Sequence, residues 1–269
     1  RPIAVALGAR VIRFLSKLWR IPVTGFGFLT FFTGGVLFRL VVFPSLNVFV
    51  KDGRRRELLA RRIVRVSFSL FIRLMSALQA LKIELDPALR ERLAHESLFV
   101  CASHPTLLDV VILHGLIDNA NCIVKSALRE SFALSSPVKA AGYITNDSGP
   151  DLIEACAASL ARGDTLVVFP EGTRSVPGRA PKLHHGAAAV SLARGRPITP
   201  VRITCTPPSL MKGIAWYQVP ERKMTISVRA APDIDVEPFL RLERERGRPV
   251  AVRRLTEALK ERLFDNTDD

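Results

Sequence analysis

The sequence contains few cysteines, and none of them suit a metal site or a disulfide framework. Among 269 residues there are four cysteines, and no two stand at Cys-x-x-Cys spacing. No histidine cluster accompanies them, so we expect no metal ion and interpret the cysteines as buried free thiols in a reducing compartment. The sequence also lacks an internal repeat, a low-complexity tract and a glycine-rich dinucleotide loop, which argues against a repeat array, a disordered chain and a dinucleotide cofactor.

Acidic residues are scarce in the first part of the chain. Residues 1–82 contain fifteen Lys or Arg and only two acids, Asp52 and Glu57, within a total net charge of +14. A nucleic-acid-binding surface is expected to spread basic residues over a polar platform with aromatic side chains. Here the basic residues interrupt Leu, Val, Ile and Phe instead. The pattern favours an anionic membrane surface, and we expect no nucleic-acid partner.

A long apolar run follows the first basic residues. Residues 21–38 carry no charge, and after Arg39 the apolar character continues to Val50. Such a length reaches the lower limit for a membrane-spanning helix, but prolines and glycines interrupt it repeatedly. We therefore predict that residues 1–50 form a helical hairpin that dips into one leaflet, with basic residues on both sides. A single transmembrane helix is the alternative.

The rest of the chain, residues 51–269, is predicted to be one α/β domain. It begins with a basic amphipathic helix over residues 54–82, where apolar residues recur at three- and four-residue spacing. Short apolar runs then alternate with helical patterns, which predicts a layered domain with a central, mostly parallel or mixed sheet flanked by helices. The predicted strands are residues 98–102, 121–125, 165–169, 198–204 and 224–229. The predicted helices are residues 106–116, 151–161, 186–193 and 250–263.

Residues 103–109, Ser-His-Pro-Thr-Leu-Leu-Asp, are the first candidate for chemistry. They set His104 and Asp109 five positions apart, between a predicted strand and a helix that Pro105 suits as its first residue. A carboxylate at one imidazole nitrogen would fix the tautomer, so that the other nitrogen accepts a proton from an attacking hydroxyl. A purely structural His–Asp hydrogen bond is the alternative at this spacing.

Residues 169–175, Phe-Pro-Glu-Gly-Thr-Arg-Ser, are the second candidate. They follow an apolar strand-like run, at the point where α/β folds have their ligand sites. Gly172 permits close backbone approach, and Arg174 can hold a phosphate through two parallel hydrogen bonds. The alternative is a surface turn with an ion pair between Glu171 and Arg174.

Together the two stretches resemble the motifs of the glycerolipid, or lysophospholipid, acyltransferases, which include the bacterial 1-acyl-glycerol-3-phosphate acyltransferases. The family's Asn-His-x-x-x-x-Asp block is matched at residues 103–109, with Ser103 in place of Asn. Its Phe-Pro-Glu-Gly-Thr-Arg-Ser block is complete at residues 169–175, and Pro197–Val201 resembles its apolar block around a proline. The resemblance covers roughly residues 95–205.

The resemblance implies transfer of an acyl chain from acyl-CoA or acyl carrier protein to a hydroxyl of a lysophospholipid, with no metal or other cofactor. It implies that His104 is the general base and that Asp109 orients it. The other residues of the implied site, which shape the acceptor pocket and bind its phosphate, are Glu171, Gly172, Thr173, Arg174 and Lys125. We expect the protein among membrane phospholipids, on the cytoplasmic face of a bacterial inner membrane.

Other interpretations remain open. Asp147 stands where the family's second block often has a phosphate-binding arginine, which leaves the acceptor head group undetermined. The pattern also resembles bacterial members associated with polyene or specialised lipids, whose acyl group would come from a carrier protein. Cys101, three residues before His104, is a rival nucleophile. A lipid-binding or scaffolding protein is the non-enzymatic alternative. His114, His184 and His185 are not expected to be catalytic.

Overall fold

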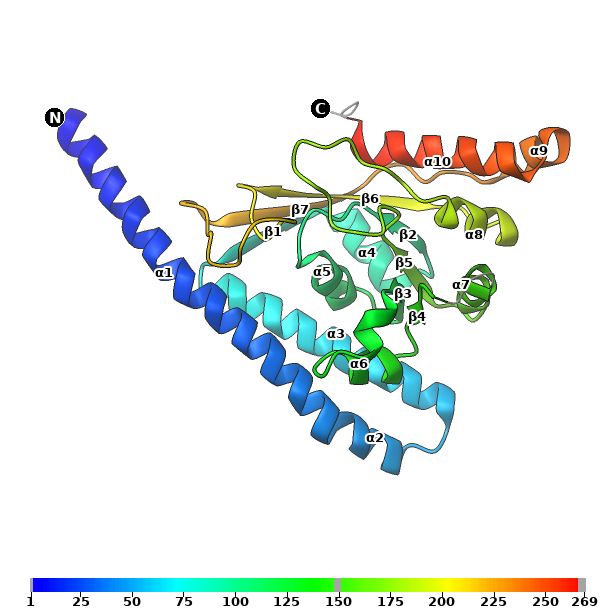
Figure 1. Cartoon of the computed structure of the whole chain (residues 1–269), viewed down its shortest axis with the longest axis horizontal. Coiled ribbons are helices and arrows are strands. Elements are labelled where there is room, and N and C mark those ends of the chain that lie inside the picture. The colour runs from blue at the N-terminus through cyan, green and yellow to red at the C-terminus, as the bar shows by residue number, and fades with distance from the viewer. Residues whose placement is uncertain (1, 148–150, 266–269) are drawn as a thin grey trace.

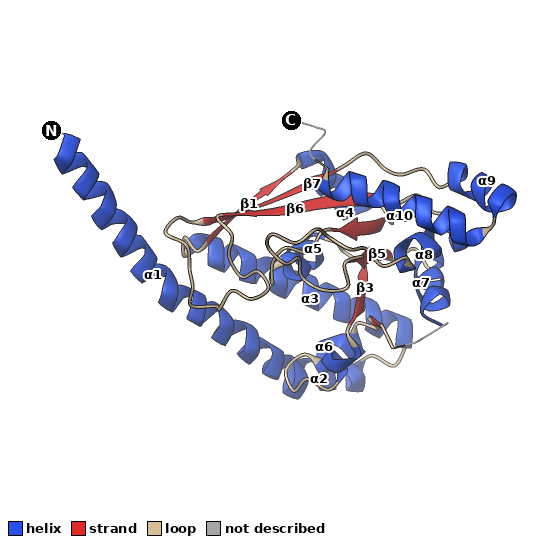
Figure 2. Ribbon diagram, turned by 45° about the horizontal axis from the view of Figure 1, so that its top comes forward, coloured by secondary structure: helices blue, strands red, loops and turns tan. Residues whose placement is uncertain are grey.

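The computed structural model describes residues 2–147 and 151–265, with side chains from residue 15 onward. Residues 1, 148–150 and 266–269 lie outside the described residues; the first belongs to the predicted membrane hairpin (residues 1–50) and the others to the predicted α/β domain (residues 51–269). A seven-stranded sheet forms the centre, in the order β1-β7-β6-β2-β5-β3-β4 (Figures 1 and 2). Only the β6–β7 pair is antiparallel, so the sheet is mixed and mostly parallel, as predicted. The strands are β1 (Leu81–Leu85), β2 (Phe99–Ala102), β3 (Ala120–Val124), β4 (Ile144–Thr145), β5 (Thr165–Val168), β6 (Thr199–Thr206) and β7 (Met224–Ala230).

Helices cover both faces of the sheet and give the layered architecture that the alternation predicted (Figure 1). On one face, α3, α4 and α5 enclose one buried apolar cluster with the sheet, and α1 joins it from outside. On the other face, α7, α8 and α10 enclose the second cluster. The helices of the domain are α3 (Gly53–Ala77), α4 (Pro87–His95), α5 (Asp109–Leu116), α6 (Ser135–Ala140), α7 (Asp151–Ala161), α8 (Gly186–Arg194), α9 (Glu237–Arg246) and α10 (Arg248–Phe264), with a 3₁₀ turn at Ser126–Arg129.

The central strands are fully buried because helices cover them on both sides. Every residue of β2 and β5 is buried, which explains why both read as continuous apolar runs rather than as alternating patterns. Their carboxyl ends lie at the same sheet edge, since β2 pairs in parallel with β5. The two motifs of the sequence follow these strands directly, so the fold brings them together.

The hairpin predicted within residues 1–50 is wrong in the position of its turn. Residues 2–37 form one helix, α1 (Pro2–Leu37), which a π turn at Phe38–Val42 joins to α2 (Phe43–Phe49). The chain reverses only between α2 and α3, and the second arm of the hairpin is the basic helix α3 (Figure 1). The π turn lies just before Pro44, whose missing N–H disturbs the regular helical bonding.

The glycines of α1 allow close packing instead of breaking the helix. A Cβ on Gly27 would lie 2.9 Å from the Cε of Met75 on α3, and one on Gly35 would lie 2.8 Å from the carbonyl oxygen of Ala133. Phe31 fills the space between them and stacks on Phe68 of α3 with ring centroids 6.0 Å apart. Tertiary packing of one helix face therefore outweighs the low helix propensity of the glycines.

The predicted helix over residues 54–82 also ends earlier than expected. α3 stops at Ala77, Gln79 adopts a positive φ of 60°, and Leu81 and Lys82 belong to the edge strand β1. β1 pairs with β7 alone and alternates in burial, so neither its length nor its apolarity marked it as a strand. The short strand β4 was missed for the same reason.

The N-terminal arm is apolar on its outer surface. Within the described residues, Leu15–Phe49 is long and apolar enough to cross a membrane, and 17% of its most apolar window is buried in the protein. Its inner face nevertheless contributes Val23 and Phe43 to the core of the domain. The arm is thus both a candidate membrane element and a structural part of the α/β unit.

Candidate active site

The first motif leaves the end of β2 and presents a histidine beside a buried carboxylate. His104 Nδ1 lies 2.8 Å from Asp109 Oδ2, the first residue of α5. The carboxylate is 0% exposed, whereas the imidazole is 17% exposed and rests on Phe169, with ring centroids 4.3 Å apart. Nδ1–H is therefore the donor to the carboxylate, and Nε2 is the nitrogen left to exchange a proton with a ligand.

The loop between His104 and Asp109 is held by the same carboxylate. Asp109 accepts hydrogen bonds of 2.6 Å from both the backbone N–H and the hydroxyl of Thr106. The helix consequently begins at Asp109, and the prediction that Pro105 would be its first residue is wrong. Leu107 N–H donates to the carbonyl of Leu210 and Leu108 N–H to the Thr106 hydroxyl, so these amides are already engaged.

Glu171 of the second motif positions the backbone of His104. Its Oε1 accepts hydrogen bonds from the backbone N–H of His104 at 3.0 Å and from the Ser175 hydroxyl at 2.9 Å. The Ser175 N–H in turn donates to the His104 carbonyl at 2.8 Å. Glu171 is buried and makes no ion pair with Arg174 among the described residues, so the alternative of a surface turn is not observed.

Arg174 lies on the loop between β5 and α8, and its side chain reaches the loop between β6 and β7. One of its Nη atoms donates to the carbonyl oxygen of Leu210 at 3.0 Å, the same oxygen that accepts from Leu107 of the first motif. The guanidinium therefore shares an acceptor with the His104 loop, and its other donors remain for a ligand. Leu210 has a positive φ of 54°, a conformation that costs about 1–3 kcal/mol outside glycine.

Lys212 is a second cation at this position, and the sequence analysis missed it. Its Nζ donates to the hydroxyl of Thr173 at 3.3 Å. No motif includes Lys212, which follows the second motif by nearly forty residues, so only the folded loop reveals its location. Gly172 next to Thr173 has φ +65°, and a Cβ there would approach His184 to 2.9 Å, so the turn requires glycine.

Lys125 lies farther out than the other predicted residues. It follows β3, which pairs in parallel with β5, so it emerges at the same sheet edge as the two motifs. Its side chain is exposed and has no hydrogen bond or ion pair with the other described residues. The structure thus brings Lys125 to the correct edge without joining it to the His104 cluster.

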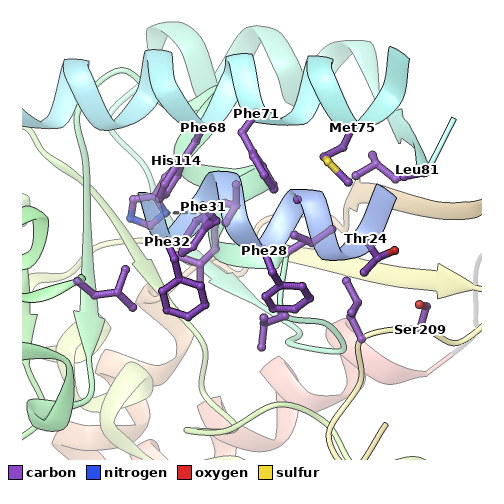
Figure 3. Close-up of a pocket in the computed structure, with 18 of the residues that line it drawn as sticks. Thr24, Phe28, Phe31, Phe32, Phe68, Phe71, Met75, Leu81, His114 and Ser209 are labelled. Carbon is purple, nitrogen blue, oxygen red and sulfur yellow. Dashed lines mark hydrogen bonds between the residues drawn. The ribbon is translucent and has the colours of Figure 1, made fainter. Parts of the chain in front are cut away.

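A cavity of about 360 Å³ opens beside the first motif and runs between the sheet, α3, α5 and α1. Leu107, Leu108 and Leu210 line its end near His104. Phe28, Phe31 and Phe32 of α1 and Phe68, Phe71 and Met75 of α3 all line it, and Figure 3 shows Phe31 beside Phe68. The sequence predicted that the N-terminal part meets a membrane, but not that its helix forms one wall of a cavity.

Comparison with known proteins finds an acyltransferase model that matches part of the chain. Residues 86–204 match the family model described as Acyltransferase, and this range contains both motifs. The chain carries an acyltransferase domain. The match agrees with the acyltransferase family that the two motifs resemble.

A solved structure has the same fold as this acyltransferase. It is described as the 1-acyl-sn-glycerophosphate (LPA) acyltransferase PlsC from Thermotoga maritima. The TM-score is 0.61 at 18% sequence identity, with 96% of this chain and 99% of that chain covered. No curated protein matches the chain. The similarity extends over the N-terminal arm as well as the acyltransferase domain.

Ser103 and Cys101, which precede His104, support the structure and do not face a substrate. Ser103, at the family's Asn position, bridges two strands: its hydroxyl donates to the Ile203 carbonyl at 3.1 Å and accepts from the Ile203 N–H at 2.8 Å. Cys101 lies within β2 with no exposure, and burial raises the pKa of its thiol far above the usual value. A buried neutral thiol is a poor nucleophile, which argues against the covalent alternative. No group of three metal-ligating side chains gathers within residues 2–147 and 151–265.

Proposed function

We propose that this acyltransferase moves an acyl chain from acyl-CoA or acyl carrier protein to a hydroxyl of a lysophospholipid such as 1-acyl-glycerol-3-phosphate. The observation that carries the proposal is the His104–Asp109 pair, whose connecting residues Leu107 and Leu108 line an apolar cavity. Arg174 and Lys212 lie on the adjoining loops, where Arg174 bonds to Leu210 of the cavity wall and Lys212 to Thr173. A base, a lipid-sized apolar space and anion-binding side chains are the three things that such a reaction needs in one location.

His104 acts as general base in this mechanism. Its Nε2 removes the proton of the acceptor hydroxyl as the oxygen attacks the thioester carbonyl, while Asp109 holds Nδ1–H and stabilises the imidazolium. The tetrahedral intermediate collapses, and the imidazolium returns the proton to the departing thiolate. Because the amides of residues 106–108 are engaged, we assign the oxyanion to backbone N–H groups of the turn at Thr173 and Arg174.

Arg174 is proposed to hold the phosphate of the acceptor. We expect Arg174→Ala to raise the acceptor KM about 10- to 100-fold, because a charge-assisted hydrogen bond contributes about 1.5–3 kcal/mol. The donor KM should stay unchanged. Steady-state kinetics with each substrate varied in turn measure both values. Arg179→Ala, on the exposed part of the same loop, is the matched control. An unaltered acceptor KM in Arg174→Ala would remove the phosphate assignment.

The cavity is proposed to hold one substrate acyl chain. α5 starts at Asp109 and leads away from the site to His114, whose ring meets Tyr143 at 5.3 Å. Val138, bonded through its carbonyl to the Tyr143 N–H, lines this distant end. We expect Val138→Phe to lower kcat/KM for long acyl chains about tenfold, because one methylene group that no longer fits an apolar pocket has an effect of this size. The kcat/KM for short acyl chains should not change.

Competition between donors of different chain length measures this selectivity, and a parallel series of acceptors tells which substrate's chain occupies the cavity. Val138→Ala enlarges the same end and should relax the length limit, which makes it the matched control. Equal loss for long and short chains in Val138→Phe would mean that the cavity does not hold the chain.

The N-terminal arm is proposed to attach the enzyme to the cytoplasmic face of a bacterial inner membrane without crossing it. One face of α1 packs on α3, and only the other exposes apolar side chains. A helix with one face bound to its own domain suits the bilayer interface better than the bilayer interior. Removing residues 1–50 would therefore also remove a cavity wall, so loss of membrane binding and loss of activity are expected together.

A further inference from the structure

Two adjacent aromatic side chains are exposed on the loop that joins β6 to β7, here termed the β6–β7 loop (residues 207–223). Trp216 is 45% exposed and Tyr217 is 57% exposed, and their rings meet edge to face with centroids 5.8 Å apart. Large aromatic side chains in such exposed positions usually mark a binding surface, because each one buries a large apolar area when covered.

The pair continues the apolar surface of α1. Trp216 packs against Phe28 with ring centroids 6.0 Å apart, and a Cβ on Gly25 would lie 3.3 Å from the Trp216 ring. Helical spacing puts the exposed side chains of Leu29 and Phe32 on the side of α1 next to this contact. The exposed apolar surface therefore extends from α1 onto the β6–β7 loop.

The same loop forms part of the cavity wall. Ser209, Leu210, Val219 and Pro220 line the cavity, and Figure 3 shows Ser209 near its end by Thr24. Arg20 of α1 is buried and donates to the Pro220 carbonyl at 3.0 Å, which fixes the loop to the helix. Trp216 and Tyr217 thus lie on the outer side of a segment whose inner side faces the acyl-chain cavity.

We propose that the β6–β7 loop is a second membrane contact, in which Trp216 and Tyr217 lie among the lipid head groups on the outer side of the acyl-chain cavity. The proposal rests on the proposed lipid acyl transfer. Trp and Tyr favour the membrane–water interface because their rings are apolar and their edges polar.

Charge and continuity favour a bilayer over a protein as the occupant. The loop carries three cations, Lys212, Arg222 and Lys223, and one acid, Glu221, for a net charge of +2 (3 − 1). The apolar surface that it extends runs along a helix within Leu15–Phe49, a stretch long enough to cross a membrane. A long apolar stripe bordered by positive charge matches an anionic leaflet.

The chain has only two tryptophans, which allows a direct test. Trp19→Phe leaves Trp216 as the single reporter in the full-length protein. On vesicles of phosphatidylglycerol and phosphatidylcholine, we expect its emission to shift to the blue and to be quenched most by lipids brominated near the head group. A control protein, Trp19→Phe/Trp216→Phe/Arg253→Trp, carries its reporter on exposed α10 and should show neither change. Unchanged Trp216 emission in vesicle-bound protein overturns the proposal.

Substitution separates this contact from the attachment by α1. We expect Trp216→Ala/Tyr217→Ala to bind the same vesicles about fivefold more weakly or worse. The KM for acceptor embedded in vesicles should rise, whereas kcat and the KM for a short-chain lysophosphatidic acid dissolved as monomers should not change. Trp216→Phe/Tyr217→Phe keeps two aromatic rings and should restore most of the binding. Equal binding by the alanine variant and the unmodified protein contradicts the proposal.

Vesicle binding needs no turnover, so this test stays informative even if the proposed acyl transfer fails. A second copy of the chain is the competing occupant of the surface. A dimer in sedimentation that Trp216→Ala/Tyr217→Ala dissociates, with vesicle binding intact, would assign the surface to self-association and overturn the membrane contact.

Discussion

We expect His104→Ala to lose at least about 10³-fold in kcat while the protein stays folded, because a positioned general base contributes about 10²–10⁴-fold and nothing else here replaces it. The acceptor hydroxyl keeps its proton at neutral pH unless a base removes it during attack. Substrate binding uses the cavity and the cations, so both KM values should change little. A radioactive-acyl transfer assay at saturating substrate measures kcat, and thermal unfolding in detergent measures the fold.

The second half of the pair has a smaller expected effect. Asp109→Asn keeps one oxygen for Thr106 but offers no negative charge to an imidazolium, so we expect a loss of about 10²–10³-fold in kcat. His95→Ala, an exposed histidine at the end of α4, is the matched control and should retain full activity. Activity within tenfold of the unmodified protein in His104→Ala would refute the mechanism. If His104→Ala unfolds, His104→Gln provides the same chemical test with more of the side chain preserved.

His114, a buried histidine that lines the cavity, does not offer a substitute base. Burial lowers the pKa of His114 to about 4. The hydrogen bond between its Nδ1 and the Val110 carbonyl raises the pKa, but by less than burial lowers it. Its Nε2 is buried without a partner among the described residues. A base so weak and so enclosed cannot accept a proton from a substrate hydroxyl at neutral pH, so residual activity in His104→Ala would need another explanation.

The sequence could predict those parts of the fold that local patterns determine. The runs that became β2 and β5 were recognised within one or two residues because they are buried on both faces and therefore continuously apolar. Those that became β3 and β6 were recognised as closely because each begins with three buried residues. The edge strand β1 has no such run, and its partner β7 lies about 140 residues away in the chain. Pairing at that distance has no local signal.

In the candidate site, too, the residues of one local motif could be predicted together, whereas contacts between distant segments could not. His104 and Asp109 were predicted as a pair because five residues across a strand-to-helix junction limit how far apart they can lie. The contact between Glu171 and the His104 backbone spans 67 residues, and Lys212 belongs to no motif. Both depend on how the loops after β5 and β6 fold against each other, which residue types alone do not specify.

The N-terminal arm was misjudged for a related reason. Proline and glycine weaken an isolated helix, so the pattern between Pro22 and Pro44 predicted breaks. In the folded protein Gly27 and Gly35 are the points where α1 approaches its neighbours most closely. The same residue type thus ends a helix in one setting and allows helix packing in another, and only the partner surface distinguishes the two.

A buried carboxylate attaches α3 to the sheet, and its substitution is expected to have a large effect on stability. Asp164, in the turn before β5, has no exposure and pairs with Arg54 and Arg61 of α3. It also accepts hydrogen bonds from Asn119 at 2.8 Å and from Ser159 at 2.7 Å. We expect Asp164→Asn to lower the free energy of unfolding by about 3–5 kcal/mol, because it leaves buried Arg61 and its neighbour Arg54 to share Glu57 as an acidic partner.

The comparison with an exposed pair makes this prediction specific. Asp118 pairs with Arg65 of the same helix but is 61% exposed, so Asp118→Asn should change the free energy of unfolding by at most about 1 kcal/mol. Denaturant unfolding of both variants in the same detergent measures the difference. Equal effects of the two substitutions would mean that the buried cluster adds nothing beyond a surface ion pair.

The pH dependence of stability provides an independent test of the same carboxylate. Burial alone would raise the pKa of Asp164, but hydrogen bonds from Arg54 and Ser159 and the charge of Arg61 outweigh burial and hold this pKa well below its usual range. A folded-state pKa below the unfolded value of about 3.9 stabilises the protein at higher pH, and this contribution is lost as the pH falls toward the folded-state pKa. The cost of Asp164→Asn should therefore be constant between neutral pH and about pH 5 and shrink below about pH 4.

Activity offers a further consequence of the same cluster, because α3 also forms a wall of the cavity. Phe68, Phe71 and Met75 lie on the helix that Asp164 anchors, and they line the cavity opposite α1. If Asp164→Asn loosens α3 in the folded state, discrimination among acyl-chain lengths should weaken while the His104–Asp109 pair, held by α5, keeps its geometry. Chain-length competition on the still-folded variant would detect this. Unchanged selectivity, combined with the expected loss of stability, would restrict the cluster to a purely structural function.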